Sequence, residues 1–414
     1  MGREMKHSGI EWIGEIPKEW EVQRLKFLCT IQTGNKDTQD ASPNGIYRFY
    51  VRSPKVEKSE TYSFDGEGIL MAGDGVGAGR VFHHVFGKYA VHQRVYRLAN
   101  IKRINSSFLF YYLSNLFCKE MDRGSAQSTV SSVRLPMLQN FMISIPPTSG
   151  QQKIADYLDK VCGEIDEMIA LQETMIEELK AYKKSVITEA VTKGLNPNVP
   201  MKGSGIDWIG EIPEGWKVMP FKWILRKPLQ YGANESGILY DEKLPRYVRI
   251  TDILNNSLRE DIQKHALTEE QANGYILEDN DILFARSGGT VGKAFIYKKK
   301  YGRCAFAGYL IRAQILSNCS PDYVYYYTQS HSYEEWKRQI FIQATIQNIG
   351  ADRYSLMELP VPPLNEQESI ASFLDEKCSE IDSLIGIKQA KIEELKEYMK
   401  SVIYEYVTGK KEVG

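Results

Sequence analysis

An internal repeat spans most of this chain and limits what it can fold into. Residues 8–17 read SGIEWIGEIP, and residues 204–213 read SGIDWIGEIP. Residues 146–192 and 362–408 are a second pair of similar segments, and both contain IEELK and KSVI. Duplication on this scale predicts two copies of one unit, each a globular module followed by a helical segment. Two similar binding surfaces held at a set distance are the expected result.

The second pair of repeated segments has the apolar spacing of long helices. Apolar residues, Met168 and Tyr182 among them, recur at intervals of three and four, and no proline occurs between residues 151 and 194. This heptad-like spacing predicts a helix of roughly 40 residues in each copy. The two helices most simply pack as an antiparallel coiled coil, since unrelated surface helices would not share IEELK and KSVI. The residues expected to pair them are Ile154, Leu158, Ile165, Leu179 and Val186 in the first helix and Ile370, Leu374, Ile381, Leu395 and Val402 in the second.

Charge is distributed unevenly, although the whole chain carries only −1. Residues 151–194 hold six Lys against nine Asp or Glu, and residues 365–409 hold five Lys against ten. These helical segments therefore carry −3 and −5, which leaves +7 for the remainder. Basic modules and acidic helices suit a protein whose modules bind phosphate while its helices bind something else. Chance segregation of charge is the plainer alternative.

Composition places the chain among folded proteins that have neither a membrane span nor a disulfide framework. Hydrophobic residues make up 43% and aromatic residues 11%, which is enough for packed cores. No apolar run reaches the length of a transmembrane helix. The six cysteines are scattered with no C-x-x-C pair, so we expect reduced thiols, no metal site and a cytoplasmic location.

The modules have the sequence pattern of a mixed α+β fold. Residues 68–72 (GILMA) and 281–285 (DILFA) are matching short strands, while the sequence between such anchors diverges, which suggests one architecture with different targets. If a pseudo-two-fold axis relates the halves, residues 7–21 should lie at the end of the second helix, and the protein would be quasi-circular. The expected domains are residues 1–149, a first module with the N-terminal repeated segment; 150–195, a first spacer helix; 196–363, a second module with its repeated segment; and 364–414, a second spacer helix.

A glycine-rich segment follows each matching strand without forming a nucleotide-binding motif. In residues 73–80 (GDGVGAGR) the G-x-G-x-x-G register puts Ala78 or Arg80 at the last glycine, and a strand-like segment follows. In residues 286–293 (RSGGTVGK) the glycines are one residue too close for a P-loop, and Ala294 replaces the Ser or Thr. A hairpin turn that ends in a cation is the plainer interpretation. Such a loop could also approach DNA closely.

Polar residues near these loops are candidates for contacts with nucleic acid. Arginines occur in residues 48–52 and 246–249, and amide or hydroxyl side chains suited to base edges occur in residues 125–128 and 343–348. For any one of them, a solvated loop residue is an equally good interpretation. The candidates are Arg48, Arg52, Arg80, Gln127 and Ser128 in the first module and Arg246, Arg249, Arg286, Ser287, Lys293, Gln347 and Asn348 in the second.

No segment has the pattern of a catalytic site. Residues 145–148 (IPPT) and 361–364 (VPPL) share only two prolines with the adenine-N6 methyltransferase motif, because the polar residue before them and the aromatic residue after them are missing. The sequence contains no helicase-type P-loop and no convincing nuclease cluster of carboxylates and lysine. It therefore predicts a binding protein and not an enzyme.

Together these features resemble the specificity subunits of type I restriction–modification enzymes. The resemblance rests on IGEIP followed by Trp in each half, on the glycine-rich turn after ILFA, and on PP, EQ, IA and LD leading into a long helix. It covers essentially the whole chain. The start of the first helix, residues 150–152 (GQQ), departs from residues 365–367 (NEQ) of the second.

The resemblance implies two target-recognition domains, each reading one half of a bipartite DNA sequence. The helices would set the spacer between the half-sites and, with the repeated segments, bind two modification subunits. Those partners would hold S-adenosylmethionine and methylate adenine, restriction subunits would use ATP and Mg²⁺, and this chain would hold no cofactor. The alternatives are a self-contained methyltransferase or nuclease, and a bivalent adaptor that does not bind DNA.

Overall fold

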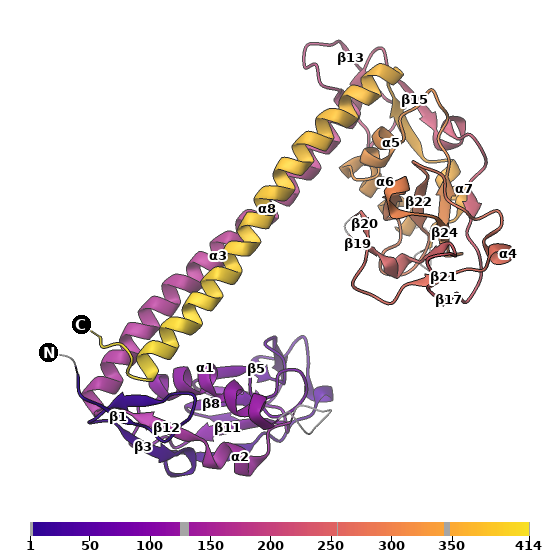
Figure 1. Cartoon of the computed structure of the whole chain (residues 1–414). Coiled ribbons are helices and arrows are strands. Elements are labelled where there is room, and N and C mark those ends of the chain that lie inside the picture. The colour runs from indigo at the N-terminus through magenta and orange to yellow at the C-terminus, as the bar shows by residue number, and fades with distance from the viewer. Residues whose placement is uncertain (1–2, 125–131, 255, 343–347, 414) are drawn as a thin grey trace. The chain divides into compact units, whose positions relative to one another are not determined.

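The computed structural model describes residues 3–124, 132–254, 256–342 and 348–413 (Figure 1). The chain divides into two units, one comprising Met1–Glu173 with Gln389–Gly414 and the other comprising Thr174–Lys388. Each unit contains one module and one half of each long helix, α3 (Thr148–Lys193) and α8 (Leu364–Val407). The units therefore divide within the helices, because each module packs against two helix halves.

Two four-stranded sheets form the first module. One has the order β4 (Thr30–Thr33), β11 (Val95–Ala99), β8 (Gly68–Ala72), β9 (Phe82–Val85), and all of its neighbours are antiparallel. The other has the order β6 (Val56–Ser59), β5 (Tyr47–Tyr50), β10 (Lys88–Val91), β7 (Phe64–Asp65), with β5 and β10 parallel. Two short antiparallel pairs are β1 (Met5–His7) with β2 (Glu15–Pro17), and β3 (Glu21–Arg24) with β12 (Met142–Ile145). The helical elements are η1 (Leu25–Phe27), η2 (Thr38–Asp40), α1 (Ser106–Gly124) and α2 (Leu135–Asn140).

The second module repeats this plan. One sheet has the order β16 (Gln230–Tyr231), β25 (Leu310–Ala313), β22 (Ile282–Ala285), β23 (Ala294–Ile296). The other has the order β17 (Ile238–Leu239), β21 (His265–Ala266), β18 (Arg246–Val248), β24 (Cys304–Phe306), with β18 and β24 parallel. The short pairs are β13 (Met201–Gly203) with β14 (Glu211–Pro213), β15 (Lys217–Pro220) with β26 (Glu358–Val361), and β19 (Ile253–Leu254) with β20 (Ser257–Leu258). The helical elements are η4 (Phe221–Ile224), η5 (Ile250–Asp252), α4 (Glu269–Ala272), η6 (Lys299–Tyr301), α5 (Pro321–Tyr327), α6 (His331–Ile342) and α7 (Ala351–Ser355).

The matching strands β8 and β22 are buried along their whole length because both of their faces are covered. In β8, Ile69 and Met71 belong to the core that contains α1, while Leu70 belongs to a second core with β10. In β22, Ile282 and Leu283 divide in the same way between two cores. The alternation follows from the two-residue period of a strand, so an all-apolar run marks a strand between two layers.

The long helices contact each other within both units. In the first unit the rings of Tyr157 and Tyr406 lie 4.4 Å apart, so the start of α3 lies beside the end of α8. In the second unit the Lys183 ammonium lies 2.7 Å from the Asp382 carboxylate, so the end of α3 lies beside the start of α8. Of the residues expected to pair the helices, Leu179 and Val186 are half-buried and the following are buried: Ile154, Leu158, Ile165, Ile370, Leu374, Ile381, Leu395 and Val402.

A buried glutamine fixes the start of each long helix to its module. The Gln151 side chain accepts from the backbone N–H of Asn105 at 2.7 Å and donates to the Pro146 carbonyl at 2.9 Å. The Gln367 side chain makes the corresponding two bonds, at 2.8 Å each, with Ser320 and Pro362. These contacts align Gly150 with Glu366, so the comparison of residues 150–152 with residues 365–367 was shifted by one residue. They also explain why both segments after the prolines become helical at the same point.

The N-terminal repeated segment contacts the end of α8 within the first unit. The Tyr404 hydroxyl donates to the carbonyl of Trp12 at 3.0 Å, and the Lys410 ammonium donates to the carbonyl of Glu15 at 2.7 Å. A Cβ on Gly409 would lie 3.1 Å from the ring of Trp20. In the second unit Gly194, at the end of α3, lies against Trp216 at the same distance.

Candidate nucleic-acid interface

The two glycine-rich loops have the same backbone geometry. Gly75 and Gly79 in the first loop have φ angles of 72° and 63°, and Gly288 and Gly292 in the second have 78° and 80°. Each loop is closed by a hydrogen bond from its last glycine to the end of the preceding strand, from Gly79 to Ala72 at 2.9 Å and from Gly292 to Ala285 at 2.8 Å. These φ values favour glycine, so the spacing of the glycines fits the hairpin turn that each loop forms.

Each loop also pairs with the segment that precedes the last strand of its module. Asp74 forms an antiparallel bridge with Ser132, and Ser287 forms the corresponding bridge with Asn348. Two polar segments that are distant in the sequence therefore lie together in each module. Ser287 is half-buried and Asn348 is exposed. The candidates Gln127, Ser128 and Gln347 lie outside the described residues.

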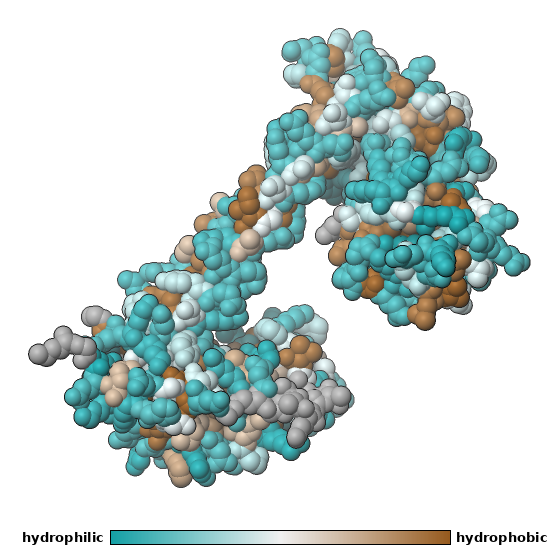
Figure 2. All heavy atoms as spheres, viewed as in Figure 1, coloured by the Kyte–Doolittle hydropathy of each residue, from teal (hydrophilic) through white to brown (hydrophobic). Residues whose placement is uncertain are grey.

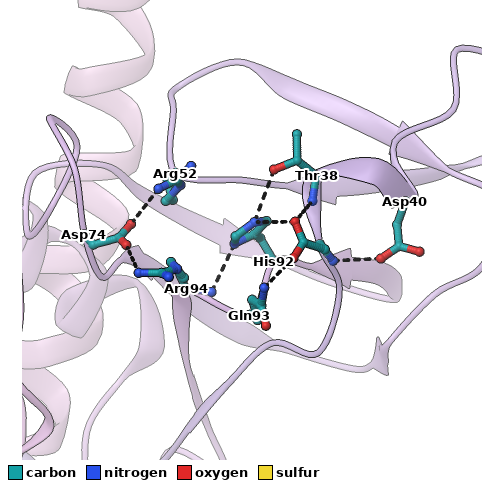
Figure 3. Close-up of polar contacts among 8 residues, drawn as sticks. Thr38, Asp40, Arg52, Asp74, His92, Gln93 and Arg94 are labelled. Carbon is teal, nitrogen blue, oxygen red and sulfur yellow. Dashed lines mark hydrogen bonds and ion pairs between the residues drawn. The ribbon is translucent and has the colours of Figure 1, made fainter.

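In the first module, Asp74 lies between two arginines (Figure 3). The Asp74 carboxylate is 3.1 Å from Arg52 and 2.8 Å from Arg94. Burial raises the pKa of this carboxyl, but the hydrogen bonds from Arg94 and Arg52 outweigh that effect and hold the pKa below its ordinary value. The Arg52 and Arg94 side chains both remain exposed. Asp74 therefore positions two cations at the surface that a ligand can still reach.

A second polar group lies next to these arginines. The buried His92 accepts from the backbone N–H of Arg94 at 3.0 Å, and its other ring nitrogen is 3.4 Å from the Thr38 hydroxyl. The Gln93 amide donates to Asp37 at 2.6 Å. Burial, and then the charge of Arg52, lowers the pKa of His92, so the imidazole is neutral at neutral pH. This network orders the backbone around Arg94 and does not add a charge.

In the second module the corresponding positions carry a different set of side chains. Arg286 is half-buried, and its guanidinium lies 4.9 Å from the centre of the Tyr231 ring. Tyr231 accepts from the backbone N–H of Ala351 at 3.0 Å, which fixes the ring. Tyr309, whose carbonyl accepts from the Arg286 backbone, occupies the place of Arg94 and is exposed. An arginine stacked on an aromatic ring is a rigid donor suited to base or phosphate oxygens.

Two of the arginines expected to contact DNA have structural partners instead. Arg246 is only 5% exposed, and it donates to Glu260 at 2.6 Å and to the carbonyl of Arg259 at 2.5 Å. Arg246 is buried because β18 is an inner strand and the side chain faces the module. Arg249 makes two hydrogen bonds to the buried carboxylate of Asp252, so it fixes the turn of η5. Its guanidinium remains partly exposed.

The remaining candidates are cations at the surface. Arg48 on β5 is exposed, and Lys293 after the second loop is exposed as well. Arg80, which follows the first loop, lies 2.8 Å from the Asp122 carboxylate. The sequence did not single out Asp74, Arg94, Tyr231 or Tyr309. The only available signal was that Arg94 and Tyr309 lie at corresponding positions three residues after an apolar strand.

The exposed cations and polar side chains of these loops are donors and acceptors that suit a phosphate or a base edge. Among the described residues, no three His, Cys, Asp or Glu side chains are grouped so that they could hold a metal ion. All six cysteines have free thiols. None of the helices in the described part of the chain is long and apolar enough to cross a membrane.

Comparison with known proteins agrees with this description. The sequence model of the family described as "Type I restriction modification DNA specificity domain" matches residues 17–181 and 223–397. The specificity subunit of type I restriction enzyme MjaVIII from Methanocaldococcus jannaschii is 25% identical over 95% of this chain and 93% of its own length. The EcoDI specificity subunit from Escherichia coli is 22% identical over 90% and 84%.

A solved structure has the same fold. It is a chain from work on complex assembly and conformational transition of the type I R-M system, and it is 15% identical to this protein with a TM-score of 0.67. The similarity covers 95% of this chain and 98% of that one. The family sequence model matches both halves of the chain, each with one module and most of one long helix. The chain belongs to the family of type I restriction–modification DNA specificity domains.

Proposed function

We propose that this chain is the DNA-specificity subunit of a type I restriction–modification complex, and that each module reads one half of a bipartite site. One observation carries the proposal: both modules hold the same loop framework but differ in the side chains on it. Asp74 with Arg94 in the first module corresponds to Ser287 with Tyr309 in the second. A shared framework with different donors and acceptors suits two different base sequences.

We also propose that the long helices form an antiparallel coiled coil that sets the spacer between the half-sites. The contacts between α3 and α8 within each unit support this, as do the buried apolar residues on both helices. The contacts of residues 12–20 with the end of α8 support a quasi-circular arrangement, since they correspond to the contact of Trp216 with the end of α3.

Two modification subunits are the proposed protein partners. Apolar side chains are exposed at matching positions of the two helices, and Figure 2 shows apolar patches on the outer surface of the helix pair. Repetition of these residues suits two copies of one partner. The exposed pairs are Met168 with Leu384, Leu171 with Ile387, and Tyr182 with Tyr398. Methylation, and any use of S-adenosylmethionine, ATP or Mg²⁺, would belong to partner subunits in the cytoplasm, while this chain supplies the sequence preference.

Selection of bound duplexes from a random pool tests the proposal. The reconstituted complex should enrich two short conserved half-sites separated by a spacer of fixed length and free sequence. Arg52→Ala and Arg94→Ala should relax or weaken only one half-site, and Arg286→Ala only the other. The salt dependence of binding should fall by about one unit of slope for each phosphate contact that is lost. Enrichment of no sequence would favour the bivalent adaptor, and methyl transfer by the chain alone would favour an enzyme.

A further inference from the structure

Each module exposes one large aromatic side chain at the same position of the repeat. Phe27 on η1 is 64% exposed, and Trp223 on η4 is 65% exposed. The positions correspond because the two turns make equivalent hydrogen bonds. The backbone N–H of Leu25 donates to the carbonyl of Phe141, just before β12. The backbone N–H of Phe221 donates to the carbonyl of Met357, just before the matching strand β26. Large aromatic groups in water are costly, so their repetition at one position calls for a reason.

The turns that carry these side chains are firmly held. Leu25 and Leu28 flank Phe27 and are buried, and Phe221 and Ile224 flank Trp223 and are buried as well. The two middle residues of each turn therefore face outward on a fixed backbone. Their exposure is a built feature of the fold and not the result of a loose loop.

The two modules have one kind of surface whose residues differ between them and another whose residues are the same in both. The loop residues proposed to read DNA differ between the modules, as expected for two different half-sites. The exposed aromatic group and the lysine before it, Lys26 or Lys222, are present in both modules. A repeated surface suits a partner that is the same for both modules, namely two copies of one chain.

The charge around the first aromatic residue indicates the chemistry of that partner. The Lys26 ammonium lies 5.2 Å from the centre of the Phe27 ring. Phe27 also borders a groove of about 710 Å³, and no carboxylate occurs among the described residues that line it. The lining residues are Val22, Gln23, Arg24, Phe27, Lys102, Arg103 and Met142. An apolar recess with carboxylates at its rim would complement this surface.

We propose that Phe27 and Trp223 are anchor residues that each dock one copy of the modification subunit, with the neighbouring lysines pairing with acidic groups of that subunit. This inference rests on the proposed function. It adds a contact surface on the modules to the one proposed on the helices. Aromatic anchors at the centre of an interface commonly carry much of the binding energy.

The test measures assembly of the full-length chain with the modification subunit from the same cells, using particle masses and binding titrations. Phe27→Ala and Trp223→Ala should each weaken one binding step by roughly thirtyfold or more. Each single variant should then yield a complex with one partner copy, and the double variant should yield the free chain at the same concentrations. Lys26→Glu and Lys222→Glu should weaken the same steps without removing an apolar group.

Phe86→Ala and Leu239→Ala are matched controls, because these residues are 68% and 72% exposed and lie elsewhere on the modules. Failure of the wild-type chain to bind any modification subunit would overturn the proposed function itself. Wild-type assembly together with unchanged assembly of the Phe27 and Trp223 variants would overturn only this inference. Normal assembly with weakened DNA binding would also overturn it, because the surface would then contact DNA.

Discussion

Two arginines of the second module differ in burial, and this difference predicts what each contributes. Arg246 is buried against Glu260, whereas Arg286 stacks on Tyr231. We predict that Arg246→Met lowers the free energy of unfolding by about 2–3 kcal/mol, because a buried charged hydrogen-bond group is lost. We predict that Arg286→Ala changes this free energy by at most about 1 kcal/mol, since the contact it removes among the described residues is a cation–π contact. Denaturant unfolding measures both values.

Sequence preference provides the second measurement for the same pair. Arg286→Ala should relax one half-site in base-by-base competition, and Arg246→Met should leave the preferred sequence unchanged. A relaxed half-site in Arg246→Met, with normal stability, would contradict the structural role assigned to Arg246.

The residues of the candidate site could be predicted only in part from the sequence. The glycine-rich loops and the polar segments after them were identified because their composition is unusual. Arg94 was missed because its contact with Asp74 depends on the register of β8 and β11, which no local pattern encodes. Arg246 was chosen as a candidate for a DNA contact because the sequence alone does not distinguish a buried, paired arginine on an inner strand from an exposed arginine on an edge strand.

At the scale of single elements, the starts of the two long helices differ in the hydrogen bond that each offers to a buried tryptophan. The Trp216 indole donates to the Glu366 carboxylate at 3.0 Å, but the buried Trp20 indole has no acceptor among the described residues, because Gly150 stands where Glu366 does. We predict that Gly150→Glu stabilises the first unit by about 1–3 kcal/mol. It would remove a helical glycine, worth about 1 kcal/mol, and add a charged acceptor near a helix N-terminus.

Gly150→Ala is the matched control for this prediction. A Cβ at this position makes only an ordinary contact, 3.4 Å from Pro146, so alanine fits and should provide the helix-propensity part alone. Denaturant unfolding of both variants isolates the hydrogen bond as the difference between them. Equal stability of the alanine and glutamate variants would show that Trp20 does not gain a partner.

The period of the long helices differs from the heptad interpretation. Met168 and Tyr182, which the heptad spacing placed in the contact, are exposed. Isoleucines recur instead every eleven residues and are all buried, at Ile154, Ile165, Ile176 and Ile187 in α3 and at Ile370, Ile381, Ile392 and Ile403 in α8. Eleven residues make three turns at 3.67 residues per turn, which does not favour a left-handed supercoil. Short windows of the sequence fit both periods, so only the full helix length distinguishes them.

The eleven-residue period predicts which changes in helix length the protein tolerates. Duplicating residues 166–176 and 382–392 adds one repeat to each helix and returns the buried face to within about 20° of its original direction. We expect this variant to fold and to keep the pairing of the helices, since each helix grows by about 16 Å with the same face buried, and denaturant unfolding measures its stability. Insertion of nine residues in each helix turns the far part by about half a turn and should prevent folding or assembly. An equally functional nine-residue variant would contradict the eleven-residue period.

For the molecule as a whole, the repeat implies that the chain could begin and end at a different connection without changing how its elements pack. Nine residues, 195–203, separate Gly194 at the end of α3 from Ser204 of the second repeated segment. Joining Val413 to Arg3 would also place nine residues between Gly409 and Ser8, namely residues 410–413 and 3–7. Both glycines have positive φ angles and lie against a tryptophan of the following segment, so the two connections would join equivalent points.

We therefore predict that a permuted chain, joined in this way and opened near residue 200, folds and binds the same duplex as the natural chain. Its unfolding free energy should lie within about 1 kcal/mol of the original, because the new ends fall in a surface connection and no packed element is cut. Denaturant unfolding and competition with the selected duplex measure the two properties. A permuted chain opened within β22 is the control and should not fold, since that strand is buried on both faces. If the chain opened near residue 200 also failed to fold, residues 7–21 would need a free N-terminus to reach the end of α8. The two halves would then be equivalent in their packing but not in their connections.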